Sequence, residues 1–295
     1  MLYHTLMLLS RIICCLPYLA LQSLGKWLGL LYHAIDRRHR EAAVRQMADC
    51  LSVSEDEARR LVRLSFINLG RVALDIFYTP VLTRENFREY IDVEHLESMQ
   101  AAWNEGKGVI IYTAHIGTWE WLSVAFPFLG FPSATFVRTQ SNTQVTRFLN
   151  TIRERNGVEV FATRSGPREM MAAARALRAG KVLGILADSD AGEGGIPVDF
   201  FGKPFSAPRG QVYFSEKFGA PVIPAFMIRR EDGRHKLVFG NPMHLEKGQE
   251  PGAGEVALAA SLTGILEKTI RDNPTQWIWY RRLWNTFAHK HDDNK

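Results

Sequence analysis

Cysteine is scarce in this sequence: the 295 residues include only Cys14, Cys15 and Cys50. Because the number is odd and two of the three are adjacent, they cannot form the disulfide framework of a small secreted protein. Their spacing also matches no zinc-binding pattern, so we expect no metal site at the cysteines. The sequence therefore indicates a reducing compartment for the bulk of the protein.

Long apolar runs are also missing. A helix that crosses a bilayer needs roughly 20 apolar residues in succession, whereas the apolar stretch from Leu2 to Ile35 is interrupted by Arg11, Pro17, Gln22 and Lys26. We expect two helices, divided at Pro17, each with a narrow polar stripe. Residues 1–40 are therefore predicted to be an apolar helical membrane-association segment, which either lies at the interface or crosses it with the stripe packed on protein. A helical hairpin buried in the domain core is the alternative.

Acidic side chains are fewer than basic ones, 31 against 36, which leaves a net charge of +5. This balance favours an anionic partner, either a nucleic acid or a phospholipid surface. Arg37, Arg38 and Arg40 directly follow the apolar segment, where they would attract anionic lipid. Arg281 and Arg282 lie among tryptophans, a composition that suits a lipid–water interface or, alternatively, a terminal strand packed on a sheet. Because no nucleic-acid-binding signature is present, we expect a membrane surface and no nucleic acid.

Repeats and low-complexity tracts are absent from the sequence, and 46% apolar with 23% charged residues is typical of a folded protein. Helical patterns at 54–77 and 96–103 precede six short β-forming runs: "GVIIYTA", "SATFV", "VEVFA", "KVLGILAD", "APVIPAFMI" and "HKLVFG". Further helical patterns lie at 118–126, 142–156, 166–179, 208–218 and 254–272. This alternation predicts one α/β domain over residues 41–288, with a mixed, largely parallel central sheet flanked by helices, and a polar tail at 289–295.

Polar side chains follow three of the predicted strands. His115 follows one strand, Arg138 follows the next, and Asp188 with Asp190 follows a third. Ligands of α/β sheets bind at the carboxyl ends of the strands. We therefore expect these four side chains to form a single site.

His115 and Glu120 are five residues apart in the stretch "YTAHIGTWEW". On one continuous helix their side chains would point about 140° apart, so they can meet only if His115 lies in a turn and Glu120 in the first turn of the helix that follows. Gly117 would loosen that turn, and Thr118 is a good N-cap. A carboxylate on one ring nitrogen would leave the other nitrogen as a general base. The alternative is a buried histidine beside a glutamate that serves the helix dipole.

The turn after His115 contains neither serine nor cysteine that could act as a nucleophile, and Thr118 would already be occupied as a cap. The base is therefore expected to activate a hydroxyl group of a bound substrate, in a direct transfer without a covalent intermediate. Backbone N–H groups at Gly117 and Thr118, where the helix starts, could stabilise an oxyanion. A groove for an apolar chain is expected nearby, lined by Trp119, Trp121, Phe126 and Phe128.

The block "AHIGTWEW" resembles the His-x-x-x-x-Asp/Glu block of glycerolipid acyltransferases, and more closely the Asn-His-x-Gly-Asn-Trp-Glu block of the late acyltransferases of bacterial lipid A biosynthesis. "FVRTQSN", "GKVLGILADSDAGEGGIPVDFFGKP", "GAPVIPAFMIRR" and "NPTQWIWYRRLW" are similar to further blocks of that family, in the same order. The sequence departs from the family pattern at Ala114 and Thr118, where Asn is usual, and at Ser189, where Gln is usual.

The resemblance implies a membrane-bound enzyme at the cytoplasmic face of the inner membrane. Such an enzyme transfers a fatty acyl group from acyl carrier protein, or from coenzyme A, to a hydroxyl group of a lipid A precursor glycolipid, and it needs no cofactor and no metal. His115 carries over as the base and Glu120 as its partner. Five residues carry over as substrate-binding positions: Arg138, Asp188, Asp190, Phe201 and Gly202.

Three other interpretations remain open from the sequence. The acceptor could be another membrane lipid, such as a mannosyl phosphoinositide or an amino-acid lipid, because the same architecture serves those acylations. Water could replace the acceptor, which would make the protein a thioesterase. A lipid-binding membrane protein that keeps the fold without catalysis is the third.

Overall fold

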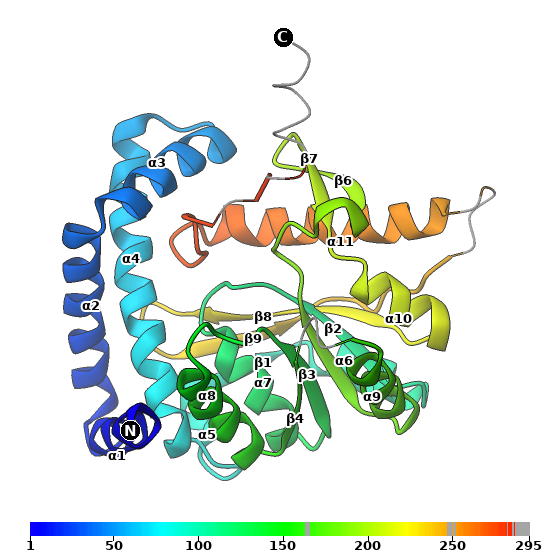
Figure 1. Ribbon diagram of the computed structural model, residues 1–295, viewed down its shortest axis with the longest axis horizontal. Coiled ribbons are helices and arrows are strands. Elements are labelled where there is room, and N and C mark those ends of the chain that lie inside the picture. The colour runs from blue at the N-terminus through cyan, green and yellow to red at the C-terminus, as the bar shows by residue number, and fades with distance from the viewer. Residues whose placement is uncertain (163–165, 247–249, 251, 282, 285, 287–295) are drawn as a thin grey trace.

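The structure is a computed structural model that describes residues 1–295 except 163–165, 247–249, 251, 282, 285 and 287–295, so that the predicted tail at 289–295 lies outside the described residues. A seven-stranded sheet forms its centre (Figure 1). The strands follow one another across the sheet in the order β1 (Ile91–Glu94), β9 (His235–Phe239), β8 (Val222–Arg229), β2 (Val109–Thr113), β5 (Val182–Leu186), β3 (Ser133–Val137) and β4 (Val158–Ala162).

The five strands from β8 to β4 are parallel, β9 is antiparallel to β8, and β1 runs parallel to β9. This confirms the predicted mixed, largely parallel sheet, and all six predicted strands are present. Strand β1 was not predicted, because "IDVE" is short and half charged. The hairpin of β6 (Ile196–Phe200) and β7 (Lys203–Ala207), which forms a separate two-stranded sheet, was also missed.

Helices cover both faces of the sheet. Successive side chains of β2 alternate between two hydrophobic cores: Val109 and Ile111 face one, Ile110 and Tyr112 the other. The first core is shared with α5 (Phe87–Tyr90), α6 (Leu96–Asn104) and α7 (Trp119–Phe128), and the second with α9 (Pro167–Arg178), α10 (Gly210–Phe218) and α11 (Ala253–Asp272). Helix α8 (Thr143–Arg155) packs on β4, and the short 3-10 helices are Thr79–Val81 and Gly192–Gly194.

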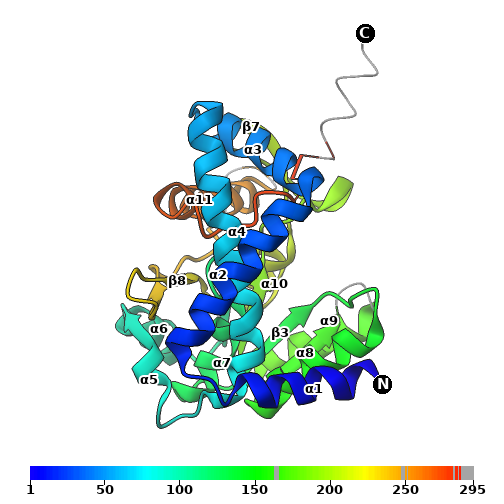
Figure 2. The same cartoon turned by 90° about the vertical axis from the view of Figure 1, so that its left-hand side faces the viewer.

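The N-terminal residues form four helices: α1 (Leu2–Ile13), α2 (Tyr18–Ile35), α3 (Arg37–Leu51) and α4 (Glu55–Tyr78). The predicted break at Pro17 is confirmed. Helices α2 and α4 lie side by side at one end of the sheet (Figures 1 and 2). They approach closely because glycines line their contact: a Cβ atom at Gly29 would lie 2.2 Å from the carbonyl oxygen of Phe66, and one at Gly70 would lie 2.2 Å from that of Gly25.

None of the helices among the described residues is both long enough and apolar enough to span a bilayer. The bilayer-crossing arrangement expected as one possibility for residues 1–40 is therefore not supported. Nor is the buried-hairpin alternative, because much of the apolar surface of α1 and α2 is exposed.

A buried polar cluster joins the N-terminal helices to the sheet. Asp75 of α4 forms an ion pair with Arg229 of β8, and both side chains are almost fully buried. From α2, the Tyr18 hydroxyl lies 3.1 Å from Asp75 Oδ1, and Gln22 Nε2 donates to the same oxygen at 2.9 Å. His235 of β9 completes the cluster, with its Nε2 2.8 Å from the Tyr18 hydroxyl. Its burial, and then the charge of Arg229, lower the pKa of His235 to about 3.

This histidine should make the protein less stable in mild acid. Its folded pKa lies below the ordinary value of about 6.5, so between these two pH values the unfolded chain binds more protons. The free energy of unfolding should therefore fall as the pH drops below about 6.5, by at most about 1.4 kcal/mol per pH unit from this group. Urea denaturation of wild type and His235→Gln at pH 7 and pH 5 checks this: the substitution should reduce the pH dependence. His33, whose pKa burial also lowers, is unchanged in both proteins and so cancels. Equal pH dependences in the two proteins would contradict the prediction.

Candidate active site

His115 and Asp188 meet at the carboxyl edge of the sheet. Strands β2 and β5 are hydrogen-bonded neighbours, with Thr113 paired to Leu186. Each of the two site residues lies two positions beyond its member of that pair, so both emerge at the same height. The expectation that strand ends would bring these polar residues together is confirmed for His115 and Asp188.

Asp188 holds both the backbone and the ring of His115. The backbone N–H of His115 donates to Asp188 Oδ2 at 3.0 Å, and His115 Nδ1 lies 2.7 Å from Asp188 Oδ1. Trp277 Nε1 donates to Oδ2 at 2.9 Å. The Asp188 side chain is fully buried, whereas that of His115 is 22% exposed. The carboxylate is thus enclosed by donors while the imidazole still reaches the surface.

The charges at this site keep Asp188 ionised. Burial by itself would raise the pKa of the carboxyl group, but His115 and Arg281, together with the hydrogen bond from Trp277, outweigh it and hold the pKa of Asp188 well below its usual range. Nδ1 has two partners, the ionised Asp188 Oδ1 at 2.7 Å and Arg281 Nη1 at 2.5 Å. The carboxylate favours the tautomer that carries its proton on Nδ1, because an ionised carboxylate can only accept. In the described part of the chain, Nε2 of His115 forms no hydrogen bond, which leaves it able to accept a proton.

The partner that the sequence suggested for His115 lies elsewhere. Glu120, at the start of α7, forms a bidentate ion pair with Arg153 of α8, with Nε donating at 2.9 Å and Nη2 at 2.7 Å. The expected hydrogen bond between Glu120 and the imidazole is therefore corrected: Asp188 occupies Nδ1. The physical reason is that a strand end can pair with its neighbouring strand end, and this contact does not depend on sequence spacing. Whether Glu120 takes part in catalysis stays a prediction.

The turn between His115 and α7 is built as expected in one respect and differently in another. Gly117 has φ +55°, and a Cβ atom there would lie 1.8 Å from the carbonyl oxygen of Met227, so glycine is required. Thr118 occupies the N-cap position of α7, but its side chain makes no capping hydrogen bond. Its hydroxyl donates to Asp75 Oδ2 at 3.0 Å instead.

The expected oxyanion site at the N–H groups of Gly117 and Thr118 is also corrected. The first donates to Gln276 O at 2.9 Å and the second to Met227 O at 3.1 Å, so both are satisfied within the protein. The next two N–H groups, of Trp119 and Glu120 at the N-terminus of α7, take part in no hydrogen bond within the described residues. A helix N-terminus attracts developing negative charge.

The remaining predicted positions do not converge on the imidazole. Arg138 is exposed directly after β3, and its guanidinium forms no ion pair within the described residues. Asp190 accepts from the backbone N–H groups of Gly192 at 2.8 Å and Thr286 at 2.9 Å, which orders the loop after β5. Phe201 and Gly202 form the turn between β6 and β7, where Phe201 N donates to Glu267 Oε2 at 2.7 Å and its ring packs against Trp277.

Two residues of the C-terminal segment belong to the site although they were not predicted for it. Trp277 is 2% exposed and donates to Asp188. Arg281 Nη1 lies 3.5 Å from Asp188 Oδ1, and its Nη2 donates to Ser189 Oγ at 2.6 Å. The alternation of tryptophan with arginine was the available signal. For Trp277 and Trp279 its interfacial interpretation is wrong, because both indoles are buried.

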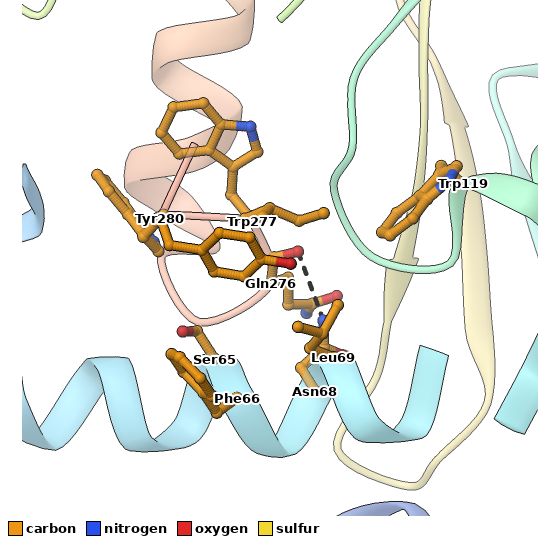
Figure 3. A pocket seen from close by; sticks show the side chains of 10 residues that line it. Ser65, Phe66, Asn68, Leu69, Trp119, Gln276, Trp277 and Tyr280 are labelled. Atoms are coloured by element: carbon orange, nitrogen blue, oxygen red, sulfur yellow. Dashed lines mark hydrogen bonds between the residues drawn. The ribbon is translucent and has the colours of Figure 1, made fainter. Parts of the chain in front are cut away.

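A small, partly open hollow with room for about one water molecule lies between α4, Trp119 and the segment 276–280 (Figure 3). Trp119 forms one end of it, and the Trp119 and His115 ring centroids are 5.2 Å apart. The other walls are Ser65, Phe66, Asn68 and Leu69 of α4 and the segment 276–280. Of the predicted groove residues only Trp119 lines this hollow. Trp121 and Phe126 are core residues with 0% and 2% exposure, and Phe128 packs against Phe87.

Within the described residues, no group of three or more histidine, cysteine or carboxylate side chains is arranged to hold a metal ion. The site's own groups are an oriented imidazole, a buried carboxylate, the Arg281 guanidinium and the N-terminus of α7. Beside an apolar hollow, this set suits proton abstraction from a hydroxyl group in a transfer reaction.

Comparison with known proteins agrees with this chemistry. A phosphatidylinositol mannoside acyltransferase of Mycolicibacterium smegmatis is 24% identical over 226 residues, which cover 76% of this chain and 72% of that protein. A lipid A biosynthesis palmitoleoyltransferase of Escherichia coli is 23% identical over 274 residues, 92% of this chain and 87% of that protein. A lipid A biosynthesis lauroyltransferase of the same organism is 23% identical, with 92% and 87% covered.

The family described as bacterial lipid A biosynthesis acyltransferase matches residues 2–286, nearly the whole length of the sequence. The match includes the apolar N-terminal helices, the strand ends that carry His115 and Asp188, and the C-terminal segment that carries Trp277 and Arg281. The chain is therefore an acyltransferase and belongs to the bacterial lipid A biosynthesis acyltransferase family.

Proposed function

We propose that this enzyme transfers a fatty acyl chain from an acyl carrier protein or coenzyme A thioester to a hydroxyl group of a lipid A precursor, with His115 as the general base and Asp188 as its partner. The observation that carries the proposal is the pair itself. A buried, ionised carboxylate holds Nδ1 at 2.7 Å, and the imidazole, whose Nε2 forms no hydrogen bond within the described residues, is 22% exposed.

The reaction proceeds by direct attack. Nε2 of His115 accepts the proton of the acceptor hydroxyl while its oxygen bonds to the thioester carbonyl carbon. The tetrahedral intermediate then collapses, the carbon–sulfur bond breaks, and the thiolate leaves with the proton that His115 returns. Asp188 stabilises the imidazolium between the two steps by its charge, so no covalent acyl-enzyme is required.

The oxyanion of the intermediate needs donors that are not already used. The N–H groups of Trp119 and Glu120 at the start of α7 meet this requirement, and Arg281 supplies a positive charge beside His115. The ion pair of Glu120 with Arg153 would keep the first turn of α7 in place. Arg138, exposed at the same edge of the sheet, suits a phosphate group of the acceptor or donor.

The hollow between α4 and the segment 276–280 would receive the first carbons of the acyl chain once its walls move apart, because in this structure it has room for about one water molecule. Each buried methylene contributes about 0.8 kcal/mol, and the walls at Phe66, Leu69 and Trp119 are apolar. Trp277 both lines this hollow and donates to Asp188, so one residue connects the acyl site with the catalytic pair.

A second acceptor class is favoured by one observation. Proteins named for the acylation of phosphatidylinositol mannosides and of lipid A have similar identities to this chain, 24% and 23%. Both acceptors are membrane glycolipids with free hydroxyl groups, so a second proposal is that the acceptor is a mannosyl phosphoinositide.

Substitution of His115 or Asp188 should abolish transfer. His115→Gln removes the base, and Asp188→Asn removes the charge that orients and stabilises it, so each should lower kcat by at least about 100-fold. The measurement is transfer of a radiolabelled acyl group from acyl carrier protein to a lipid A precursor in detergent. His244→Gln is the matched control. His244 also contacts a carboxylate, that of Glu105 at 3.2 Å, but its side chain is 49% exposed and neither residue belongs to the site.

If Asp188→Asn keeps its activity while Glu120→Gln loses it, Asp188 is not the catalytic partner of His115, and Glu120 would take that role. The same assay with phosphatidylinositol mannoside as acceptor decides between the two acceptor classes. Release of free fatty acid at an equal rate with and without either acceptor would identify a thioesterase instead.

We also propose that α1 and α2 attach the enzyme to the cytoplasmic face of the inner membrane. The face of α2 that packs on the protein carries Gln22, Gly25 and Gly29, whereas its outer face is apolar. Leu19, Trp27 and Ile35 on that outer face are 73%, 66% and 72% exposed, and Leu8, Leu9 and Ile12 extend the surface along α1. An apolar surface of this kind, with Arg11, Lys26, Arg37 and Arg38 exposed beside it, suits an anionic bilayer surface.

Charged substitutions on this surface should weaken membrane binding. Trp27→Asp combined with Leu31→Asp removes two exposed apolar side chains, and the partition coefficient onto vesicles of phosphatidylglycerol and phosphatidylethanolamine should fall at least about tenfold. Co-sedimentation measures it. Met171→Asp with Val256→Asp is the matched control, because these side chains are 56% and 43% exposed but belong to α9 and α11. Equal binding by the two double variants would rule out the proposed attachment surface.

A further inference from the structure

The ion pair of Asp75 and Arg229 lies directly behind the turn that carries His115. Asp75 Oδ1 accepts from Gln22 and contacts Tyr18, while Oδ2 accepts from Thr118 at 3.0 Å and from Arg229. The guanidinium donates in turn to Gln22 Oε1 at 2.8 Å, to Asn68 Oδ1 at 3.2 Å and to Thr118 Oγ1 at 3.0 Å. Each oxygen of the carboxylate thus has two partners.

Thr118 is the residue through which this pair touches the active-site turn. Its hydroxyl group donates to the carboxylate and accepts from the guanidinium, and its side chain is fully buried. It lies three residues beyond His115 and begins α7, whose first two N–H groups are the unpaired ones. A displacement of Thr118 would therefore move both the base and these donors.

The backbone of the same turn is anchored on two further sides. The N–H of Gly117 donates to Gln276 O, and that of Thr118 to Met227 O. These bonds fix the turn to the C-terminal segment and to β8, respectively. The Thr118 hydroxyl ties it to Asp75 of α4, the helix that also forms a wall of the hollow. In the first turn of α7, Trp121 Nε1 donates to the Asp75 backbone oxygen at 3.0 Å.

The energetics of buried ion pairs indicate what this one contributes. Desolvation of two charges costs several kcal/mol per ion, so a well-packed apolar pair of similar volume is often as stable or more stable. Burial would also raise the pKa of Asp75, yet the charge of Arg229 outweighs it and leaves the pKa of Asp75 below its ordinary value, so the pair stays charged. Unlike apolar packing, the charges and directed hydrogen bonds of this pair fix the position of the Thr118 hydroxyl that lies between them.

We infer that Asp75, Arg229 and Thr118 are positioning residues for His115, acting through the two hydrogen bonds of the Thr118 hydroxyl. The inference rests on the proposed function for its kinetic consequence, because a misplaced base lowers the rate of the chemical step. Displacement of a reacting group by about 1 Å can cost about 100-fold in rate.

The test is Thr118→Val, which removes the hydroxyl and keeps the shape of the side chain. We expect kcat per folded molecule to fall by about tenfold or more with KM about unchanged, because the lost interaction acts on the chemical step. Thr118→Ser, which keeps the hydroxyl, should restore most of the rate. Thr263→Val is the matched control: this threonine is equally buried at 2% exposure, but its hydroxyl contacts Ala259 O within α11 and the Tyr112 side chain, and neither Asp75 nor Arg229. Its kcat should stay at the wild-type value even if its melting temperature falls.

A second readout does not require acyl transfer. The proton on His115 Nδ1, bonded to Asp188, should give a downfield NMR resonance, assigned by its absence in His115→Gln. In Thr118→Val this resonance should move upfield and exchange faster with water, whereas in Thr263→Val it should be unchanged. If Thr118→Val does not fold, Thr118→Ala makes the same test.

The outcomes separate the two proposals. Wild-type kcat and an unchanged resonance in Thr118→Val would overturn the positioning role, and so would equal losses of kcat in Thr118→Val and Thr263→Val. A wild-type protein that transfers no acyl group would overturn the proposed function alone, and the resonance would then decide the positioning role.

Discussion

Two hydrogen bonds to the Asp188 carboxylate restrain His115: its backbone N–H donates to Oδ2 at 3.0 Å, and its ring nitrogen Nδ1 lies 2.7 Å from Oδ1. Because one bond fixes the main chain and the other fixes the imidazole, the ring can neither shift along the sheet edge nor rotate freely. Both bonds exist only because β2 and β5 are neighbours with matched ends. The arrangement of the sheet is therefore the constraint on which the site depends.

The surroundings of Asp188 come from the last part of the chain. Trp277 closes the carboxylate off from solvent and donates to it, and the rings of Phe200 and Phe201 pack around that indole. The hairpin of β6 and β7 thereby supports Trp277, the residue that donates to Asp188. A positive φ of 56° at Phe201 is stabilised there by the hydrogen bond from its N–H to Glu267.

Helix α2 differs from the usual helix of a globular protein, because many of its large apolar side chains face outward. The side of α2 that faces the protein carries Gln22, Gly25 and Gly29 beside a single buried leucine, Leu21, and the outer side carries leucine, tryptophan and isoleucine. Gln22 can lie on the inner side because its amide group forms hydrogen bonds with Asp75 and Arg229. The outer side can be apolar because a bilayer surface is the proposed partner. Through Gln22, Asp75 and Thr118, the helix proposed to touch the membrane is connected by hydrogen bonds to the turn that bears His115, the proposed base.

Six of the seven strands of the central sheet could be predicted from the sequence, and His115 could be singled out, because β-forming runs, helical periodicity and a glycine-containing turn are local signals. Its partner could not. Glu120 is near in sequence and Asp188 is 73 residues away, yet the distant residue makes the contact, because the order of strands across a sheet is decided by packing of whole βα units. Packing of distant segments also explains why Glu120 forms its ion pair with Arg153, and why Trp277, near the end of the chain, donates a hydrogen bond to Asp188. Local residue pattern thus determined which groups could do chemistry, and tertiary packing alone decided which of them meet, since only packing can bring together side chains from distant parts of the sequence.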